Sequence, residues 1–219
     1  MNRVEHIGNT TFHLAVGRLN DASDLINLYH YSARVPANIQ VAATLHRPGG
    51  LFGDLGEPIV ACLFSIPPTR WAEPVLELSR LVRCEDTRPP LSGLIAQTCN
   101  FLKKNNIIDL VVSFADPTYG HHGGVYQSAS WKYGGKRERR MDGVIWRGSF
   151  IPGRSANSRW GTRSPTKLQK QGIYVEPHFD EGKHIYWRAL NRNGKKKAER
   201  LGLEDLAYPK PDLITEATA

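Results

Sequence analysis

A carboxylate and a tyrosine flank a glycine-rich loop in the middle of the chain. Asp116 follows the apolar residues 107–114 closely, and Tyr126 comes just after Gly123 and Gly124. A carboxylate just past a buried strand lies at the carboxyl edge of the sheet, where open α/β folds place their sites. We expect the loop and a short helix to bring Tyr126 back toward Asp116. The carboxylate could then take a proton and the hydroxyl could donate one.

Residues 78–96 combine an expected strand, a turn and the start of a helix, where backbone N–H groups bind phosphate. The segment resembles the pyrophosphate-binding loop of the GCN5-related N-acetyltransferases, whose pattern is Arg-x-x-Gly-x-Gly. Arg88 and Gly93 match this pattern, and Leu91 replaces its first glycine, which predicts a weak site. The resemblance implies acetyl-CoA as a cofactor, held by four residues: Arg83, Arg88, Ser92 and Gly93. A strand, a proline-rich turn and a helix also occur in α/β proteins without this cofactor.

Several separated blocks of the sequence resemble, in the same order, the phage Mom proteins. The blocks are Leu78-Ser79-Arg80, residues 112–131 around Asp116, and Arg159-Trp160-Gly161-Thr162. Mom proteins are linked to the conversion of adenine in DNA to its N6-carbamoylmethyl form. The resemblance covers roughly residues 20–190. It implies a phage or prophage enzyme that adds a small acyl-derived group to N6 of adenine and so protects DNA from restriction.

The same resemblance implies a set of catalytic residues. They are His30, Tyr31, Arg80, Asp116 and Tyr126, with Arg83 as the alternative to Arg80. Plain acetyl transfer would attach a carbonyl carbon to N6, whereas the family's product carries a methylene with a terminal amide, so the group donor stays open. Two other functions stay open as well. One is an ordinary acetyl-CoA-dependent N-acetyltransferase acting on a small amine or a protein, and the other is a catalytically inactive DNA-binding accessory protein.

The glycine loop also contains two adjacent histidines, His121 and His122. Together with Asp116 and His30 they could supply nitrogen and oxygen ligands to a divalent metal such as iron. A histidine pair in a glycine loop equally suits contact with a substrate phosphate or with solvent. The sequence leaves the metal undecided.

Positive charge is concentrated in the second half of the chain. Residues 132–200 contain 18 Lys and Arg against 6 Asp and Glu, whereas residues 1–131 contain 10 against 11. Clustered cations are typical of proteins that bind nucleic acid phosphates, although a solvated basic face is the alternative. We expect double-stranded DNA as the partner. The target adenine should be flipped out, because stacking in the duplex hides its amine.

A basic segment, residues 152–183, interrupts the expected order of strands. Ser164 can cap a short helix with Pro165 at its first position, and Gly172 can end that helix. We interpret the segment as an inserted arm that contacts DNA. Five cations in it are the candidate contacts: Arg154, Arg159, Arg163, Lys167 and Lys170.

The elements that must position these residues follow an α/β (α+β) order with a mixed central sheet. Apolar patterns predict strands at residues 11–17, 39–45, 58–66, 75–83, 107–114, 144–151 and 184–190 and helices at 22–29, 91–105 and 125–129. Asn20 or Asp21 could cap the first helix. With the resemblances, this order implies a GCN5-related N-acetyltransferase-like fold with a basic insertion near the C-terminus. We expect one domain over residues 1–190 and a flexible tail, first basic and then acidic, over residues 191–219.

Length and composition suit a soluble protein with one substantial core, since the chain has 219 residues. No apolar run approaches the roughly 20 residues that a membrane helix needs. The N-terminal residues do not form a signal peptide, so we expect a cytoplasmic location. Cys62, Cys84 and Cys99 lie far apart, which predicts buried thiols rather than disulfides or a zinc site. The oligomeric state stays open, and a homodimer is one alternative.

Overall fold

The computed structural model describes residues 2–7, 10–49, 55–68, 70–84 and 91–210. This part of the chain divides into two compact units. The first unit is made of residues 2–114, 123–135 and 185–210, and the second of residues 115–122 and 136–184. None of the helices in these residues has the length and apolar character that crossing a membrane demands.

The first unit is built on an eight-stranded sheet with the strand order β1-β2-β3-β4-β5-β6-β11-β7. Strands β1 to β5 pair antiparallel with their neighbours, and β5 pairs parallel with β6. The predicted mixed central sheet is therefore confirmed. Its strands are β1 (Asn2–Ile7), β2 (Thr10–Val16), β3 (Ile39–Pro48), β4 (Leu55–Ser65), β5 (Leu76–Arg83), β6 (Leu110–Ala115), β7 (Lys132–Lys136) and β11 (His184–Ala189). The sequence patterns did not predict β1 and β7.

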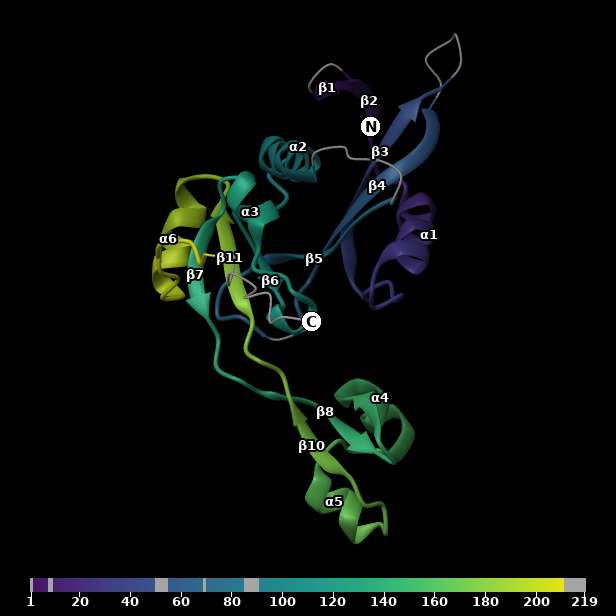
Figure 1. The fold of residues 1–219 in the computed structure, drawn as a ribbon. Helices are drawn as coiled ribbons and strands as arrows, with labels where there is room; N and C mark the ends of the chain where they lie inside the picture. The colour runs from purple at the N-terminus through teal and green to yellow at the C-terminus, as the bar shows by residue number, and fades with distance from the viewer. Residues whose placement is uncertain (1, 8–9, 50–54, 69, 85–90, 211–219) are drawn as a thin grey trace, which may run out of the picture. The chain divides into compact units, whose positions relative to one another are not determined.

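Helix α1 (Leu19–Tyr29) packs beside β3 and β4, as Figure 1 shows. It buries Ala22, Leu25 and Ile26, which share one helical face. The helix begins earlier than predicted, and the expected capping by Asn20 or Asp21 is wrong. Arg18 occupies the cap position without a side-chain cap bond, and its Nε donates to Asp21 Oδ2 at 2.5 Å.

Helix α2 (Leu91–Lys104) confirms the predicted helix at residues 91–105. Its buried residues are Leu94, Ile95, Thr98, Cys99 and Leu102, spaced as the sequence pattern required. The three cysteines are free and buried, as expected. Burial raises the pKa of the Cys62 and Cys99 thiols to about 12, so neither is a reactive thiolate at neutral pH.

The expected flexible tail is wrong for residues 191–210. Asn191 caps helix α6 (Arg192–Arg200) by accepting from the Gly194 backbone N–H at 2.9 Å. On the inner face of the helix, Ala198 joins the core cluster of Val75, Leu110, Val112 and Trp187. Helix α6 therefore belongs to the first unit. Residues 211–219 lie outside the described residues.

The second unit has its own three-stranded antiparallel sheet, in the order β10-β8-β9. The strand predicted at residues 144–151 is instead part of a hairpin of two strands, β8 and β9. Because this hairpin belongs to the second unit, the inserted segment begins near residue 136 and not at residue 152. The unit's buried apolar residues are Ala115, Val144, Ala156 and Leu168. The elements are β8 (Met141–Trp146), β9 (Ser149–Pro152), α4 (Gly153–Trp160), α5 (Pro165–Lys170), β10 (Glu176–Phe179) and the 3-10 turn η1 (Pro117–Tyr119). Ser164 and Pro165 begin α5 as predicted.

Candidate functional site

Strands β5 and β6 pair over only a short stretch of the first unit. Their parallel ladder contains the pairs Leu76 with Val111 and Glu77 with Val112. Just beyond it, the Ser113 hydroxyl donates to the Leu78 carbonyl at 2.7 Å and so replaces the next ladder bond. Beyond this point, the described residues of β5 pair only with β4. The end of β5, which contains Arg80, is thus separated from β6.

A bulge at Ser79 changes the direction of side chains along β5. Leu63 of β4 is opposite Arg80, and the following Phe64 is opposite Leu78, so Ser79 is the extra residue. The Ser79 hydroxyl donates to the Leu63 carbonyl at 3.2 Å and accepts from Ser65 at 2.9 Å. Two hydroxyl groups therefore hold the bulge from within the sheet.

Arg80 links this bulge to the loop after α1. Its Nε donates to the Arg34 carbonyl at 2.9 Å, and a terminal nitrogen donates to the Ser79 carbonyl at 2.6 Å. Arg34 lies a few residues beyond His30 and Tyr31. The structure thus connects the β5 arginine predicted for the site with the helix end that presents the predicted His-Tyr pair.

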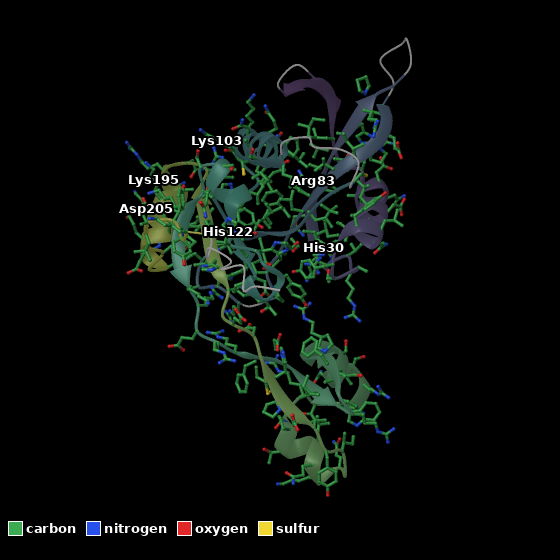
Figure 2. The ribbon with its side chains drawn as sticks, in the orientation of Figure 1. His30, Arg83, Lys103, His122, Lys195 and Asp205 are labelled. Atoms are coloured by element: carbon green, nitrogen blue, oxygen red, sulfur yellow. The ribbon has the colours of Figure 1, made fainter. Side chains whose placement is uncertain are left out.

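His30 ends α1, where Figure 2 marks it, and its ring is fixed by the next turn. Its Nδ1 accepts from the Ser32 backbone N–H at 3.1 Å, and the Ser32 hydroxyl is 2.9 Å from the same atom. Because a backbone N–H can only donate, the proton of the neutral imidazole is on Nε2. The Tyr31 ring lies 4.3 Å from the His30 ring, centroid to centroid, and Tyr31 is 56% exposed.

Tyr126 lies in the interior of the first unit, on helix α3 (Gly124–Ser128). Gly123 precedes this helix, and only glycine fits there. Its φ is +85°, and a Cβ at this residue would lie 2.1 Å from the Tyr186 ring. The rings of Tyr186 and Trp131 lie 5.2 and 5.6 Å from that of Tyr126. Tyr126 is therefore an aromatic core residue with one polar end.

The hydroxyl of Tyr126 is 2.8 Å from that of Ser113. Ser113 has one proton, and while it donates this proton to the Leu78 carbonyl, Tyr126 is the donor of the second bond. Burial raises the pKa of Tyr126 to about 12, and the nearby Tyr31 and Glu77 also raise it. Tyr31 of the His-Tyr pair is thus one of the residues that act electrostatically on Tyr126.

Asp116 belongs to the second unit, where it is the cap residue of η1. Its carboxylate accepts from the Thr118 backbone N–H at 3.1 Å, and Oδ2 lies 2.9 Å from Lys183 Nζ. Burial acts to raise the pKa of Asp116, but the bond and charge of Lys183, helped by Thr118, outweigh it and lower the pKa. The carboxylate is therefore ionised at neutral pH. Sequence reasoning missed Lys183, because no local pattern connects it with the distant aspartate.

Arg80 is linked to the loop that follows His30 and Tyr31, and these three residues and Tyr126 belong to the first unit, whereas Asp116 belongs to the second. The proposed metal ligands are divided in the same way, since His121 and His122 also belong to the second unit. Across the described ranges, the side chains of His, Cys, Asp and Glu form no group of three or more that could hold a metal ion. The iron hypothesis therefore gains no support from the structure.

The expected cofactor residues surround the start of α2. Ser92 and Gly93 are in its first turn, where backbone N–H groups have no acceptor within the helix. Leu91 is the first residue of the helix and is half-buried. Arg83 is exposed at the end of β5 and is labelled in Figure 2. Arg88 lies outside the described residues.

The expected DNA contacts all lie in the second unit and are all exposed. Arg154 and Arg159 are on α4, Lys167 and Lys170 are on α5, and Arg163 is in the link between them. The unit thus presents five cations on two short helices and their connection.

The fold and these residues define a mixed α/β protein with a mixed central sheet and an inserted basic unit. Residues 11–210 match the model of the Mom protein family. The chain therefore belongs to the Mom protein family. No curated protein matches the chain significantly.

Several solved structures of acetyltransferases are similar to the chain in fold. A ribosomal-protein alanine acetyltransferase from Vibrio fischeri has a TM-score of 0.48 and 7% identity, covering 87% of this chain and 98% of that one. A Bacillus subtilis acetyltransferase in complex with CoA has a TM-score of 0.45 and 11% identity, with coverages of 87% and 98%. A GNAT family acetyltransferase from Elizabethkingia anophelis with acetyl-CoA bound has a TM-score of 0.42 and 9% identity, with coverages of 86% and 97%.

Proposed function

We propose that the chain is a phage or prophage transferase that modifies adenine in double-stranded DNA. It would add a small acyl-derived group, of the carbamoylmethyl type, to N6 and thereby protect the DNA from restriction. The observation that carries this proposal is the match to the Mom family over residues 11–210. The match includes every residue proposed for catalysis and for DNA binding.

The chemistry requires that N6 lose a proton as it forms its new bond. This amine is conjugated with the purine ring and is a weak nucleophile, so an acceptor must be placed on its N–H. Asp116 suits this role because it is ionised and because Lys183 and Thr118 orient it. Its lowered pKa means that it holds the proton only weakly. The proton must then pass on to solvent.

The first unit supplies groups that can assist the departure of the leaving group. His30 accepts a bond at Nδ1, so Nε2 is the atom that can donate a proton, and Tyr31 is an exposed residue. Arg80 adds a fixed positive charge at the bulge of β5. We propose that these three residues contact the reacting groups. Tyr126 would position them through Ser113, at the place where β5 and β6 separate.

A coenzyme A thioester, acetyl-CoA above all, fits the start of α2 only in part. Ser92 and Gly93 would offer backbone N–H groups to its pyrophosphate, and Arg83 would add charge. Leu91 occupies a position where close backbone approach favours glycine. When bound, such a cofactor supplies an activated acyl group. The methylene carbon of the family's product requires a further donor or a second step.

Nucleoside mass spectrometry of plasmid DNA tests the proposal directly. Cells expressing the full chain should contain a deoxyadenosine of increased mass, which cells expressing Asp116→Asn should lack. Asp24→Asn is a matched control, because Asp24 is an exposed carboxylate on α1 and is not one of the proposed residues. Unmodified DNA in the presence of folded protein would contradict the proposal. Coenzyme A binding without any DNA binding would then favour an ordinary N-acetyltransferase.

A further inference from the structure

The turn of the β8–β9 hairpin contains an arginine in an unusual backbone conformation. Trp146 pairs with Ser149, and the two residues between them, Arg147 and Gly148, have φ values of +51° and +77°. Two positive φ values define the type I′ turn, which favours asparagine, aspartate or glycine at its first position. The turn conformation therefore does not explain why an arginine is at position 147.

The Arg147 side chain belongs to a cluster with two tryptophans and a second arginine. Its guanidinium lies over the Trp146 ring, 4.7 Å from the centroid. The Arg159 guanidinium of α4 lies 4.6 Å from the same centroid and 5.2 Å from that of Trp160. The two indoles meet edge to face at 5.7 Å. We call Trp146, Arg147, Arg159 and Trp160 the Arg–Trp cluster.

The two guanidinium groups of the cluster are held by aromatic rings rather than by carboxylates. Among the described residues, no Asp or Glu forms an ion pair with Arg147 or Arg159. Other cations of the chain are neutralised, as Lys183 is by Asp116 and Lys197 by Asp109. A guanidinium stacked on an indole keeps its planar N–H donors available at its edges, and stacking limits its side-chain freedom.

This arrangement suits an oxyanion with several acceptor oxygens. Both arginines are exposed, and they direct two positive charges to one short stretch of surface beside Trp146. Planar guanidinium groups bind phosphate in a bidentate manner. Both guanidinium groups already lie over the Trp146 ring, where a base would otherwise stack. The geometry therefore favours the backbone of nucleic acid over its bases.

We propose that the Arg–Trp cluster is a phosphodiester clamp that binds the DNA backbone without regard to sequence. The proposal rests on the proposed function, because it takes DNA as the partner of the second unit. The exposed Arg154, Arg163, Lys167 and Lys170 of α4, α5 and their link would extend the contact from the clamp along the same strand.

The test measures how binding of the full chain to a labelled DNA duplex depends on salt. Arg147→Asn together with Arg159→Gln removes both charges, and asparagine suits the positive φ of the turn. We expect the slope of log K against log salt to decrease by about two, one for each lost phosphate contact. Lys103→Gln with Lys104→Gln is the matched control, because it removes two exposed charges at the end of α2, where Figure 2 marks Lys103. This control should keep the parent slope.

A second variant separates the clamp from net charge. Trp146→Leu removes no charge but takes away the ring that holds both guanidiniums, so its affinity should decrease as well, by at least several-fold. Its melting temperature is measured in parallel. If Trp146→Leu does not fold, the double variant Arg147→Asn with Arg159→Gln still tests the clamp.

If the parent binds DNA and the double variant keeps the parent slope, the clamp is wrong and the proposed function survives. If the control lowers the slope equally, only general charge matters, which also overturns the clamp. A parent that binds no DNA would contradict both proposals.

Discussion

Lys183 Nζ lies 2.9 Å from Asp116 Oδ2, which makes an ion pair between residues far apart in the sequence. The lysine precedes the last strand of the sheet, and the aspartate follows β6. Asp116 is nearly buried, whereas the Lys183 side chain is 39% exposed. The pair therefore orients the Asp116 carboxylate and favours its ionised form. It also makes Lys183 a candidate positioning residue.

Replacing Lys183 should shift the pH dependence of the reaction. Lys183→Met removes the charge that lowers the pKa of Asp116, and burial then raises this pKa. Since the ionised carboxylate is the active form, the acidic limb of the activity profile should move to higher pH. Modification assayed from about pH 5 to 8 checks this. Lys136→Met, which changes an exposed lysine of the same unit, should keep the parent profile.

The same ion pair should contribute to stability only above acidic pH. The folded-state pKa of Asp116 is lowered, so its contribution is present above the unfolded pKa of about 3.9 and is lost as pH falls through the folded value. Lys183→Met should therefore melt below the parent at pH 7, and the gap should narrow below about pH 4. Calorimetry at several pH values measures the gap. A gap that stays constant with pH would mean that Lys183 acts by packing alone.

Asp116→Asn should reduce modification severely without unfolding the protein. The amide keeps the shape of the carboxylate but has no basic oxygen, and the partly exposed Lys183 remains solvated. We expect a loss of about 10²–10⁴-fold, the usual size of a general-base effect. Asp24→Asn should modify DNA at the parent level. Parent activity in both variants would assign Asp116 a structural role as the cap of η1.

Most of the sheet and the central helix follow from sequence patterns. The spacing of Leu94, Ile95, Thr98, Cys99 and Leu102 located α2, and the apolar runs located β3 to β6. Helix α6 was missed because its inner face contains only Gly194 and Ala198 as buried residues. So weak an apolar signal cannot distinguish a packed helix from a basic tail. The β8–β9 hairpin was read as one strand because Arg147 is an atypical turn residue.

The candidate site is predictable in its residue types but not in its connections. Asp116 and Tyr126 stand out by their place around the glycine loop, and His30 and Tyr31 by family resemblance. The bonds from Ser113 to Tyr126 and from Lys183 to Asp116 depend on tertiary packing. No spacing in the sequence encodes them. The sequence also suggested that Tyr126 donates a proton to substrate, whereas its hydroxyl is buried against Ser113.

Tyr126→Phe should lower stability and activity in parallel with Ser113→Ala. Each variant removes one of the two hydroxyl groups that are hydrogen-bonded to each other. Loss of this bond should lower the free energy of unfolding by about 1 kcal/mol. If Tyr126 acts through Ser113, the double variant should lose little more activity than either single variant. Thermal melting and nucleoside mass spectrometry provide the two measurements. A complete loss of activity in Tyr126→Phe alone, at unchanged activity in Ser113→Ala, would instead make Tyr126 a direct proton donor.

Acetyl-CoA should bind weakly, because Leu91 is the residue that begins α2. Leu91→Gly should tighten binding measured by calorimetry, provided that melting shows the variant folded. Leu91→Ala keeps a Cβ and should tighten binding less. Tight binding by the parent would show that the leucine is compatible with a diphosphate and would favour the ordinary N-acetyltransferase.

Gly194→Ala should destabilise the first unit, because α6 packs too closely for a side chain at this position. A Cβ on Gly194 would lie 2.0 Å from the Asp109 carbonyl oxygen and 3.2 Å from Ala189 Cα, and backbone atoms cannot rotate away as a side chain can. The same helix is tied to Asp109 by Lys197 Nζ at 2.7 Å, so relief would require this contact to shift. We expect a cost of about 1–3 kcal/mol, as for other overpacked sites, despite the better helix propensity of alanine. Asn193→Ala, at the exposed neighbouring position, should change the melting temperature little. Equal melting of both variants would mean that α6 is not packed against Asp109 in solution, as a flexible tail would require.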